Sequence, residues 1–294
     1  MRQYFRRFTR LRLLWRCVAL IGACWFYVRQ PEAVLWLVRG DWFGTSAGEF
    51  GKVSELAEGS GGGLTGMILF FGAVWILLAC GMVTRYFPSR IESMGCQKQF
   101  AQFYVARTAN YECAENEADS DGRRFGTVRG EEAWRREKRR ADLGALGDLV
   151  VWCACNGVVY WLYGRGIIHE VHMLLICLFY AVCDMVCILC FCPFRVLIMK
   201  NRCCTTCRIY NWDALMMMTP MLLSRNIAIQ VLNVLALGLF LRWEWTWQKH
   251  PERFLEVTNE TLSCGNCEHP AGCAGCVRRD RKLSQENKLR QGKM

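Results

Sequence analysis

The sequence predicts an all-α fold, a polytopic integral membrane bundle of six helical spans with a cysteine-rich cytoplasmic tail. Hydrophobic residues make up 53% of the 294 positions, and they gather in long runs, whereas most charged residues lie between and beyond those runs. The formal net charge is +11, and basic loops of this kind orient a membrane protein. The aromatic and aliphatic content excludes a disordered chain, and a small disulfide-stapled secreted domain does not fit this length.

The N-terminal arm up to Arg16 carries six arginines and no acid, and an apolar stretch follows that charges interrupt at Arg29 and Glu32. This order is similar to a secretory signal, but bulky aromatic residues stand where a cleavage site needs small ones. We therefore predict an uncleaved first span over roughly residues 17–38, with its interrupting charges snorkelling or facing other helices.

The next three spans are marked by apolar runs. Residues 64–83 (LTGMILFFGAVWILLACGMV) contain no charge and have the length that a bilayer-crossing helix needs. Residues 149–164 form a shorter run that charged residues bound sharply. Residues 171–194 form another run, which includes a single acid, Asp184, and closes at Pro193.

Residues 209–247 allow two interpretations. One long helix over 214–241 is possible, with a break at its centre. Two short spans over about 209–223 and 226–245, turning at Arg225, are the other possibility.

Topology decides between these alternatives, because cytoplasmic loops collect Lys and Arg. The N-terminal arm, the tail and segments 84–148 and 195–208 are rich in these residues, whereas 39–63 carries more acids than bases. The basic regions share one side of the membrane only if 209–247 crosses twice. We therefore predict a multi-pass protein of the cell membrane with six spans and both termini cytoplasmic. Five spans is the alternative, and it would expose the glycosylation sequon at 259–261.

Four regions follow from this reading. Residues 1–95 hold the basic arm and the first two spans, 96–148 form a charged cytoplasmic segment, 149–247 hold the remaining membrane helices, and 248–294 form a basic, cysteine-rich tail. Within the second region, residues 131–146 have helical charge spacing, which indicates a solvated helix or a basic face on anionic lipid.

The tail carries the most specific chemical pattern among the 19 cysteines. Cys264, Cys267, Cys273 and Cys276 form two CxxC pairs, and two such turns can direct four thiolates at one metal ion. His269 lies between the pairs and could replace one thiolate. We predict a zinc ion or an iron–sulfur cluster here, whereas an oxidising compartment would favour two disulfides.

A second cluster, Cys203, Cys204 and Cys207, follows the fourth span among basic residues. These thiols are predicted as cofactor-binding, either adding ligands to the tail site or forming a separate one. Nearby positive charge could instead lower a thiol pKa and make it redox-active, and juxtamembrane cysteines are also palmitoylation sites.

Inside the fourth span, Cys183, Cys187 and Cys190 share one helix face, where packing is the favoured explanation. Asp184 differs, because a carboxyl group in hydrocarbon is costly unless it is neutral or partnered. We expect a hydrogen-bond partner on another span, or a proton or cation path. The expected partners are polar residues of the other spans: Asn156, Gln230, Asn233 and Arg225.

Two further patterns are weaker. His169 and His172 are spaced to share a metal or a haem, although a solvated loop pair is the simpler explanation. Three tryptophans at 243, 245 and 247 fit an aromatic belt at the membrane interface.

These patterns predict an integral membrane protein with a cytoplasmic four-cysteine metal site. Zinc would be structural or would dock a soluble protein partner, and an iron–sulfur cluster would transfer electrons. The alternatives are a small transporter or channel using Asp184, and a thiol–disulfide enzyme using the CxxC pairs. The bilayer is the expected partner and nucleic acid is not, since membrane orientation explains the basic arms. No catalytic residue is readable.

Overall fold

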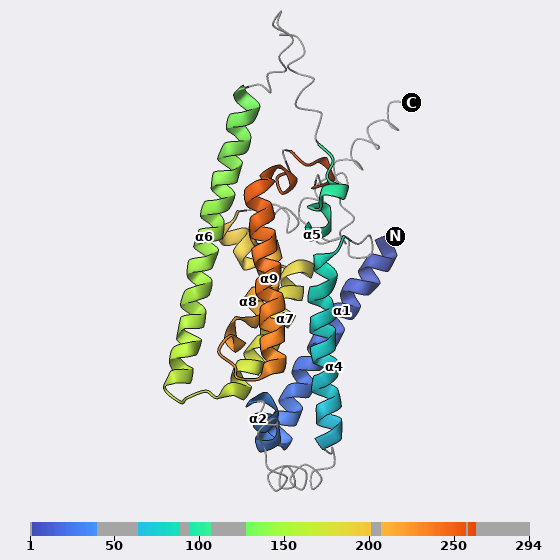
Figure 1. The fold of residues 1–294 in the computed structure, drawn as a ribbon, viewed down its shortest axis with the longest axis vertical. Helices are drawn as coiled ribbons and strands as arrows, with labels where there is room; N and C mark the ends of the chain where they lie inside the picture. The colour runs from blue at the N-terminus through green and yellow to red at the C-terminus, as the bar shows by residue number, and fades with distance from the viewer. Residues whose placement is uncertain are drawn as a thin grey trace, which may run out of the picture.

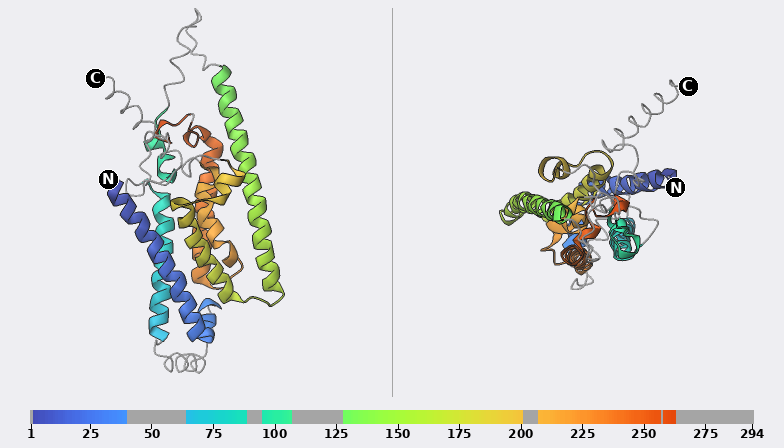
Figure 2. Two further views of the ribbon diagram at one scale, coloured as in Figure 1. Left: turned by 180° about the vertical axis from the view of Figure 1, so that it is seen from behind. Right: turned by 90° about the horizontal axis from the view of Figure 1, so that it is seen from above.

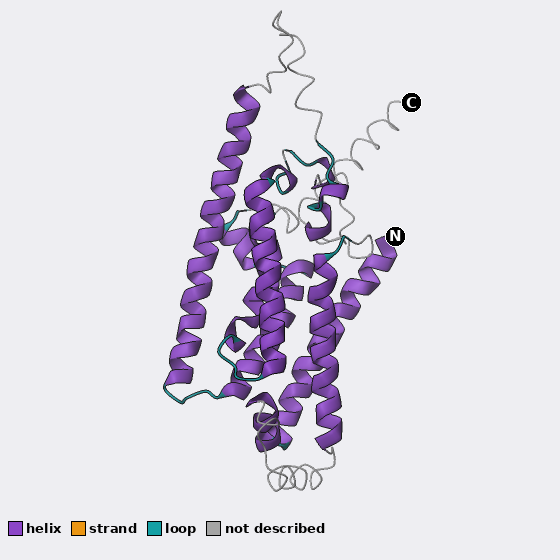
Figure 3. Cartoon of the chain, in the orientation of Figure 1, coloured by secondary structure: helices purple, strands orange, loops and turns teal. Residues whose placement is uncertain are grey.

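The structure is a computed structural model that describes residues 2–39, 64–88, 95–106, 128–200, 207–256 and 258–262. Within these ranges every regular secondary-structure element is a helix, and no strand occurs (Figures 1 and 3). Five helices are long and apolar enough to cross a membrane: Arg10–Arg29, Thr65–Tyr86, Trp134–Gly164, Glu170–Leu189 and Ile227–Lys249. The predicted all-α membrane bundle is therefore confirmed.

The first crossing begins earlier than the sequence suggested. Helix α1 (Arg2–Arg29) ends before Gln30, and the short helix α2 (Pro31–Arg39) starts on a new axis because Pro31 has no N–H to continue the first helix. The predicted span over 17–38 is therefore wrong in its bounds. The crossing extends instead over 10–29, which includes three arginines of the basic arm, Arg10, Arg12 and Arg16.

Helix α4 (Leu64–Val83) has the predicted bounds, and the 3-10 turn η2 (Thr84–Tyr86) extends it. Helix α6 (Val128–Gly164) is longer than either of the two segments predicted there, because it joins them into one continuous helix. At about 1.5 Å per residue α6 is longer than a hydrocarbon layer of about 30 Å, so its N-terminal part projects beyond the bundle (Figure 1).

Helix α7 (Glu170–Leu189) ends earlier than predicted, and a single π-helical turn, η6 (Phe194–Ile198), follows it. The chain then passes through three short helices before the last long one. These elements are η8 (Arg208–Trp212), α8 (Asp213–Met218), η9 (Thr219–Met221) and α9 (Ile227–Lys249).

The three short helices form one broken segment, residues 208–221, beside α9. At one end, the guanidinium of Arg208 bonds Glu244, near the end of α9. At the other, Asn233 donates to the carbonyl of Met221, near the start of α9. The segment therefore runs antiparallel to α9 over most of its length, and the prediction of two pieces in 209–247 is confirmed against one long helix. Asn226 closes the turn by accepting the amide of Ala228.

The start of α1 and the end of α9 lie at the same end of the bundle (Figure 2). The helical turn α5 (Gly95–Lys98) lies at this end too, and residues 258–262 are fixed on its segment. Lys98 donates to the carbonyl of Thr261, and Asn259 donates to the carbonyl of Lys98. Asn259 is fully buried, so the predicted sequon is inaccessible in this fold.

The tryptophans at the end of α9 face the interior more than the membrane surface. Trp243 and Trp247 are 3% and 1% exposed and pack edge-on against Phe254, whereas Trp245 is exposed. The predicted interfacial belt is therefore wrong for two of its three members. The edge-on packing of these aromatic rings fills the interior at this end of the bundle.

Candidate functional site

Asp184 forms an ion pair that spans two helices. Its Oδ2 atom lies 2.6 Å from Nη1 of Arg16 on α1, and the same guanidinium nitrogen lies 2.6 Å from the carbonyl oxygen of Ala181. The two side chains are 18% and 11% exposed. The expectation of a partner for Asp184 is confirmed, but the partners named from the sequence are wrong, because an arginine assigned to the N-terminal arm occupies that place.

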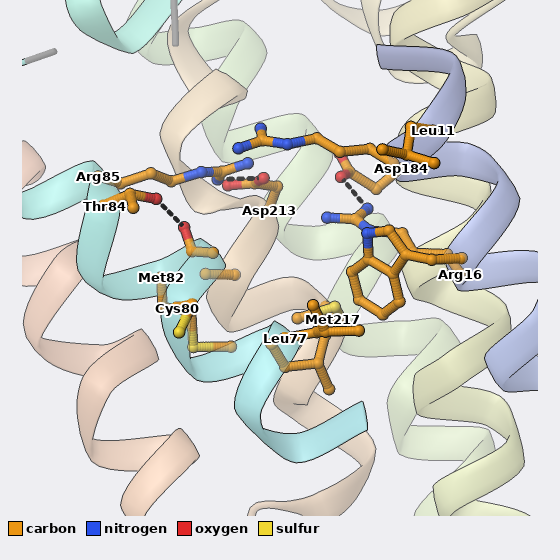
Figure 4. A pocket seen from close by; sticks show the side chains of 15 residues that line it. Leu11, Arg16, Leu77, Cys80, Met82, Thr84, Arg85, Asp184, Asp213 and Met217 are labelled. Atoms are coloured by element: carbon orange, nitrogen blue, oxygen red, sulfur yellow. Dashed lines mark hydrogen bonds and ion pairs between the residues drawn. The ribbon is translucent and has the colours of Figure 1, made fainter. Parts of the chain in front are cut away.

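A second ion pair lies beside the first. Arg85 in η2, at the end of α4, pairs with Asp213, the first residue of α8, and both side chains are mostly buried. Arg85 and Asp213 also act electrostatically on Asp184. Four charges, from α1, η2, α7 and α8, thus form two neighbouring ion pairs, which we call the charge quartet (Figure 4).

The charge quartet lines a cavity of about 390 Å³. Arg12 on α1 also lines this cavity, so three arginines and two aspartates meet there. The other walls are mostly apolar side chains, among them Trp15, Leu77 and Met217. A volume of this size holds a small solute. Convergent charges in an apolar cavity interact strongly, because the surroundings screen them less than water does.

The quartet leaves hydrogen-bonding capacity unused. Nε of Arg16 and Oδ1 of Asp213 are both buried without a hydrogen-bond partner. Buried polar atoms in native proteins are nearly always paired, so an unpaired donor and an unpaired acceptor in one group are unusual. The arrangement is therefore suited to exchange partners, either with a bound solute or after a side-chain rearrangement.

A smaller cavity of about 120 Å³ also reaches Asp184 and Asp213, and it is rich in thiols. Its walls include Tyr180 and Arg195 and four cysteines, namely Cys183, Cys187, Cys192 and Cys207. Cysteines 183 and 187 therefore face a cavity as well as packing between helices. Cys190, which the sequence placed on the same face, is exposed.

Among the described residues, no group of three or more His, Cys, Asp or Glu side chains is arranged to hold a metal ion. The predicted tail ligands Cys264, Cys267, Cys273 and Cys276 lie outside the described residues, as do Cys203 and Cys204. Cys207, which completes that second cluster, is 6% exposed and packs beside Met199 and Trp212.

His169 and His172 lie at the start of α7 and cap the helix there. The Nδ1 atom of His172 accepts the backbone N–H of His169 at 3.1 Å, and its Nε2 atom lies 3.3 Å from the hydroxyl of Tyr27. This arrangement forms a capping box at the helix N-terminus. It gives both imidazoles a structural role at the start of a helix, which differs from the solvated loop pair expected from the sequence.

Sequence reasoning missed three members of the quartet. Arg16 was assigned to the cytoplasmic arm, and Arg85 and Asp213 flank apolar runs, where charges are common. It also missed Asp148, which is fully buried in α6 and whose two carboxylate oxygens have no hydrogen-bond partner. The quartet could have been found by looking for opposite charges at the same depth in neighbouring spans. That comparison requires the bounds of the first span, which the sequence analysis placed too far along the chain.

No protein-family model, no curated protein and no solved structure matches this chain.

Proposed function

We propose that this integral membrane protein is a carrier for a small charged solute and that the charge quartet is its binding site. The observation that carries the proposal is the meeting of four charges from four elements on a cavity of solute size. Ionisable groups at membrane depth are costly and commonly mark transport pathways.

The broken segment 208–221, which lies beside α9, supports the same proposal. Asp213 lies where η8 gives way to α8, so one acid of the quartet belongs to an interrupted helix. Transporters commonly form substrate sites from discontinuous helices, because the interruptions free polar groups at membrane depth.

The quartet also suggests how a solute binds. An anionic group would displace Asp184 from Arg16, and a cationic group would displace Arg85 from Asp213 (Figure 4). Either exchange keeps the buried charges paired, which avoids the large cost of an isolated ion in a low dielectric. A solute that bears both charges would engage both pairs.

The orientation that we propose places the end with α5 in the cytoplasm. The projecting part of α6 at this end is basic, as are the loop after α7 and the end of α9. Short loops rich in Lys and Arg remain cytoplasmic. Both chain termini would then be cytoplasmic.

Uptake by proteoliposomes tests the carrier. Vesicles containing the full chain would be offered a mixture of amino acids, amines and small carboxylates, and their contents would be measured by mass spectrometry. We expect accumulation of at least one solute, and loss of that uptake in Asp184→Asn and Asp213→Asn. Glu252→Gln, at a half-exposed carboxylate outside the cavity, is the matched control. Uptake equal to that of empty vesicles would overturn the proposal.

A second candidate function rests on the tail. Its two CxxC pairs favour a four-thiolate metal site, with zinc or an iron–sulfur cluster as the cofactor. Thr261 and Leu262, just before Cys264, are fixed to the bundle by Lys98 and by burial of the leucine. A site here would present itself to a soluble protein partner at the cytoplasmic face.

Anaerobic purification of the full chain tests this second function. One zinc per chain in colourless protein supports a structural or docking site, because four thiolates leave no open position for catalysis. A brown chromophore with iron and sulfide supports electron transfer. Protein without stoichiometric metal, or metal retained after all four tail cysteines are changed to Ser, would overturn it.

A further inference from the structure

The chain folds back on itself directly after α7. The amides of Cys190 and Phe191 both donate to the carbonyl of Val186, at 2.8 and 3.2 Å, which tightens the last turn of the helix. This turn brings Cys192 to the wall of the small cavity that Cys187 also lines, where the two thiols are hydrogen-bond partners. In a continuous helix, residues 187 and 192 would lie on different faces. The turn after α7 instead makes their two thiols neighbours.

The surroundings favour reaction at Cys192 over Cys187. Cys192 lies outside the membrane-spanning part of α7, is only partly buried, and accepts the amide N–H of Arg195 at 3.5 Å. The hydrogen bond from Cys187, that amide and the positive charge of Arg195 together hold the pKa of the Cys192 thiol below its ordinary value. Cys187 belongs to α7 itself and lines the same cavity as Asp184, one helical turn away. A nucleophilic thiolate next to a protonated thiol is the arrangement used by dithiol redox sites.

We propose that Cys187 and Cys192 form a redox-active dithiol that low-molecular-weight disulfides oxidise to an intramolecular disulfide. The proposal is independent of the carrier function and of the tail metal site. It concerns cysteines other than those of the CxxC pairs.

The reaction takes place in two exchange steps. The Cys192 thiolate attacks one sulfur of the small disulfide, which releases one small thiolate and leaves a mixed disulfide on Cys192. Cys187 loses its proton to solvent and attacks the Cys192 sulfur, which releases the second small thiolate. The small disulfide gains two electrons and the protein loses two, so the small disulfide is the oxidant.

The other charged groups near this pair set its reactivity. Asp184 is one helical turn from Cys187, and Asp148 on α6 acts electrostatically on Cys192, so carboxylates face the pair from two helices. Arg195 is the cation on the loop itself. The negative charges slow deprotonation of Cys187, which makes the second step the slower one.

The experiment uses the full chain in lipid nanodiscs, incubated with bis(2-hydroxyethyl) disulfide. Remaining thiols are then blocked with N-ethylmaleimide, and the protein is digested with chymotrypsin. Cleavage after Phe191 separates the two cysteines, so their disulfide appears as a linked pair of peptides that dithiothreitol releases. We expect this pair in the wild type, and a stable mixed disulfide on Cys192 in Cys187→Ser.

Cys190→Ser is the matched control, since Cys190 lies between the two thiols but is exposed. This variant should still form the linked pair, whereas Cys192→Ser should form none. Linkage through Cys190 in the wild type, or a Cys187→Ser variant without the mixed disulfide, would overturn the proposal. A wild type whose two thiols remain fully alkylated after oxidation would also overturn it.

Discussion

Arg16 and Asp184 are 168 positions apart in the chain, yet Nη1 of one and Oδ2 of the other are 2.6 Å apart inside the bundle. The pair joins α1 to α7 where each helix would otherwise place an isolated charge in hydrocarbon. Since the pair faces a cavity, its structural and functional roles must be separated by experiment.

Removing one partner of this pair should cost more than removing both. Arg16→Met or Asp184→Leu alone leaves an unpaired buried charge, for which we expect a loss of about 3–5 kcal/mol in stability. The double variant replaces both charges by apolar groups and should recover most of that loss. Thermal unfolding in detergent micelles measures all three. Additive losses would contradict the ion pair, whereas a stable double variant without uptake would separate transport from folding.

The sequence predicts where most of the long helices lie, but it does not predict which residues of different helices contact one another. Helix α4 was predicted to its terminal residues because the uncharged run at 64–83 is bounded on both sides by polar chain. Helix α1 was misplaced because Arg12 and Arg16 look like loop residues until a partner is known. That partner, Asp184, lies 168 positions further along the chain on α7, and no periodicity within one sequence connects the two.

Asp184 itself was recognisable because a single acid within an apolar run is conspicuous. Asp213 and Arg85 were not, because they lie at the ends of apolar runs, and their burial depends on how the broken segment 208–221 packs. The turn near Arg225 was predicted, but the 3-10 character of η8 and η9 depends on tertiary packing and had no local signal.

A different arginine, Arg208, fixes the start of the broken segment 208–221 to α9. Its guanidinium makes two bonds of 2.6 Å to Glu244 and stacks over the ring of Trp247 at 4.3 Å. Lysine keeps the charge but loses the two-pronged geometry and the flat stacking face. We expect Arg208→Lys to cost about 2 kcal/mol in thermal unfolding experiments. Arg165→Lys, at an exposed arginine, is the control, and equal effects would contradict this role.

Asp148 should be a position where the protein can be stabilised. Its carboxyl group is fully buried and both oxygens lack a hydrogen-bond partner, so folding removes its hydration without replacement. Asp148→Leu keeps a similar volume and removes that cost. We expect a rise of a few degrees in Tm, since about 1 kcal/mol shifts a chain of this size by roughly 2–4 °C. A fall in Tm would show that the carboxyl group is satisfied by a partner.

The close approach of α1 and α4 depends on Gly22. A Cβ atom at this position would overlap the ring of Phe70, whereas one at Gly72 in α4 would meet nothing within 4 Å. Small residues allow such approaches between membrane helices. We expect Gly22→Ala to cost about 1–3 kcal/mol and Phe70→Leu to relieve part of it. Gly72→Ala is the matched control and should be neutral, so a similar loss there would contradict the argument.

The reactivity of Cys192 should depend on pH in a direction set by its neighbours. The hydrogen bond from Cys187 is the largest influence that lowers the Cys192 pKa, and the amide and charge of Arg195 add to it, against burial. Only the thiolate is alkylated, so reactivity persists below about pH 8.5, the ordinary thiol value, and is lost as the pH falls through the lowered pKa.

Alkylation of Cys192 by iodoacetamide, followed by mass spectrometry from pH 5 to 10, gives the midpoint directly. Cys187→Ala should raise this midpoint most, because it removes the thiol that donates to Cys192. Arg195→Gln should raise it less, because the amide N–H at 3.5 Å remains. The protein unfolded in guanidinium should return to the ordinary value. If the folded and unfolded proteins share one midpoint, the contact between Cys187 and Cys192 does not activate the thiol.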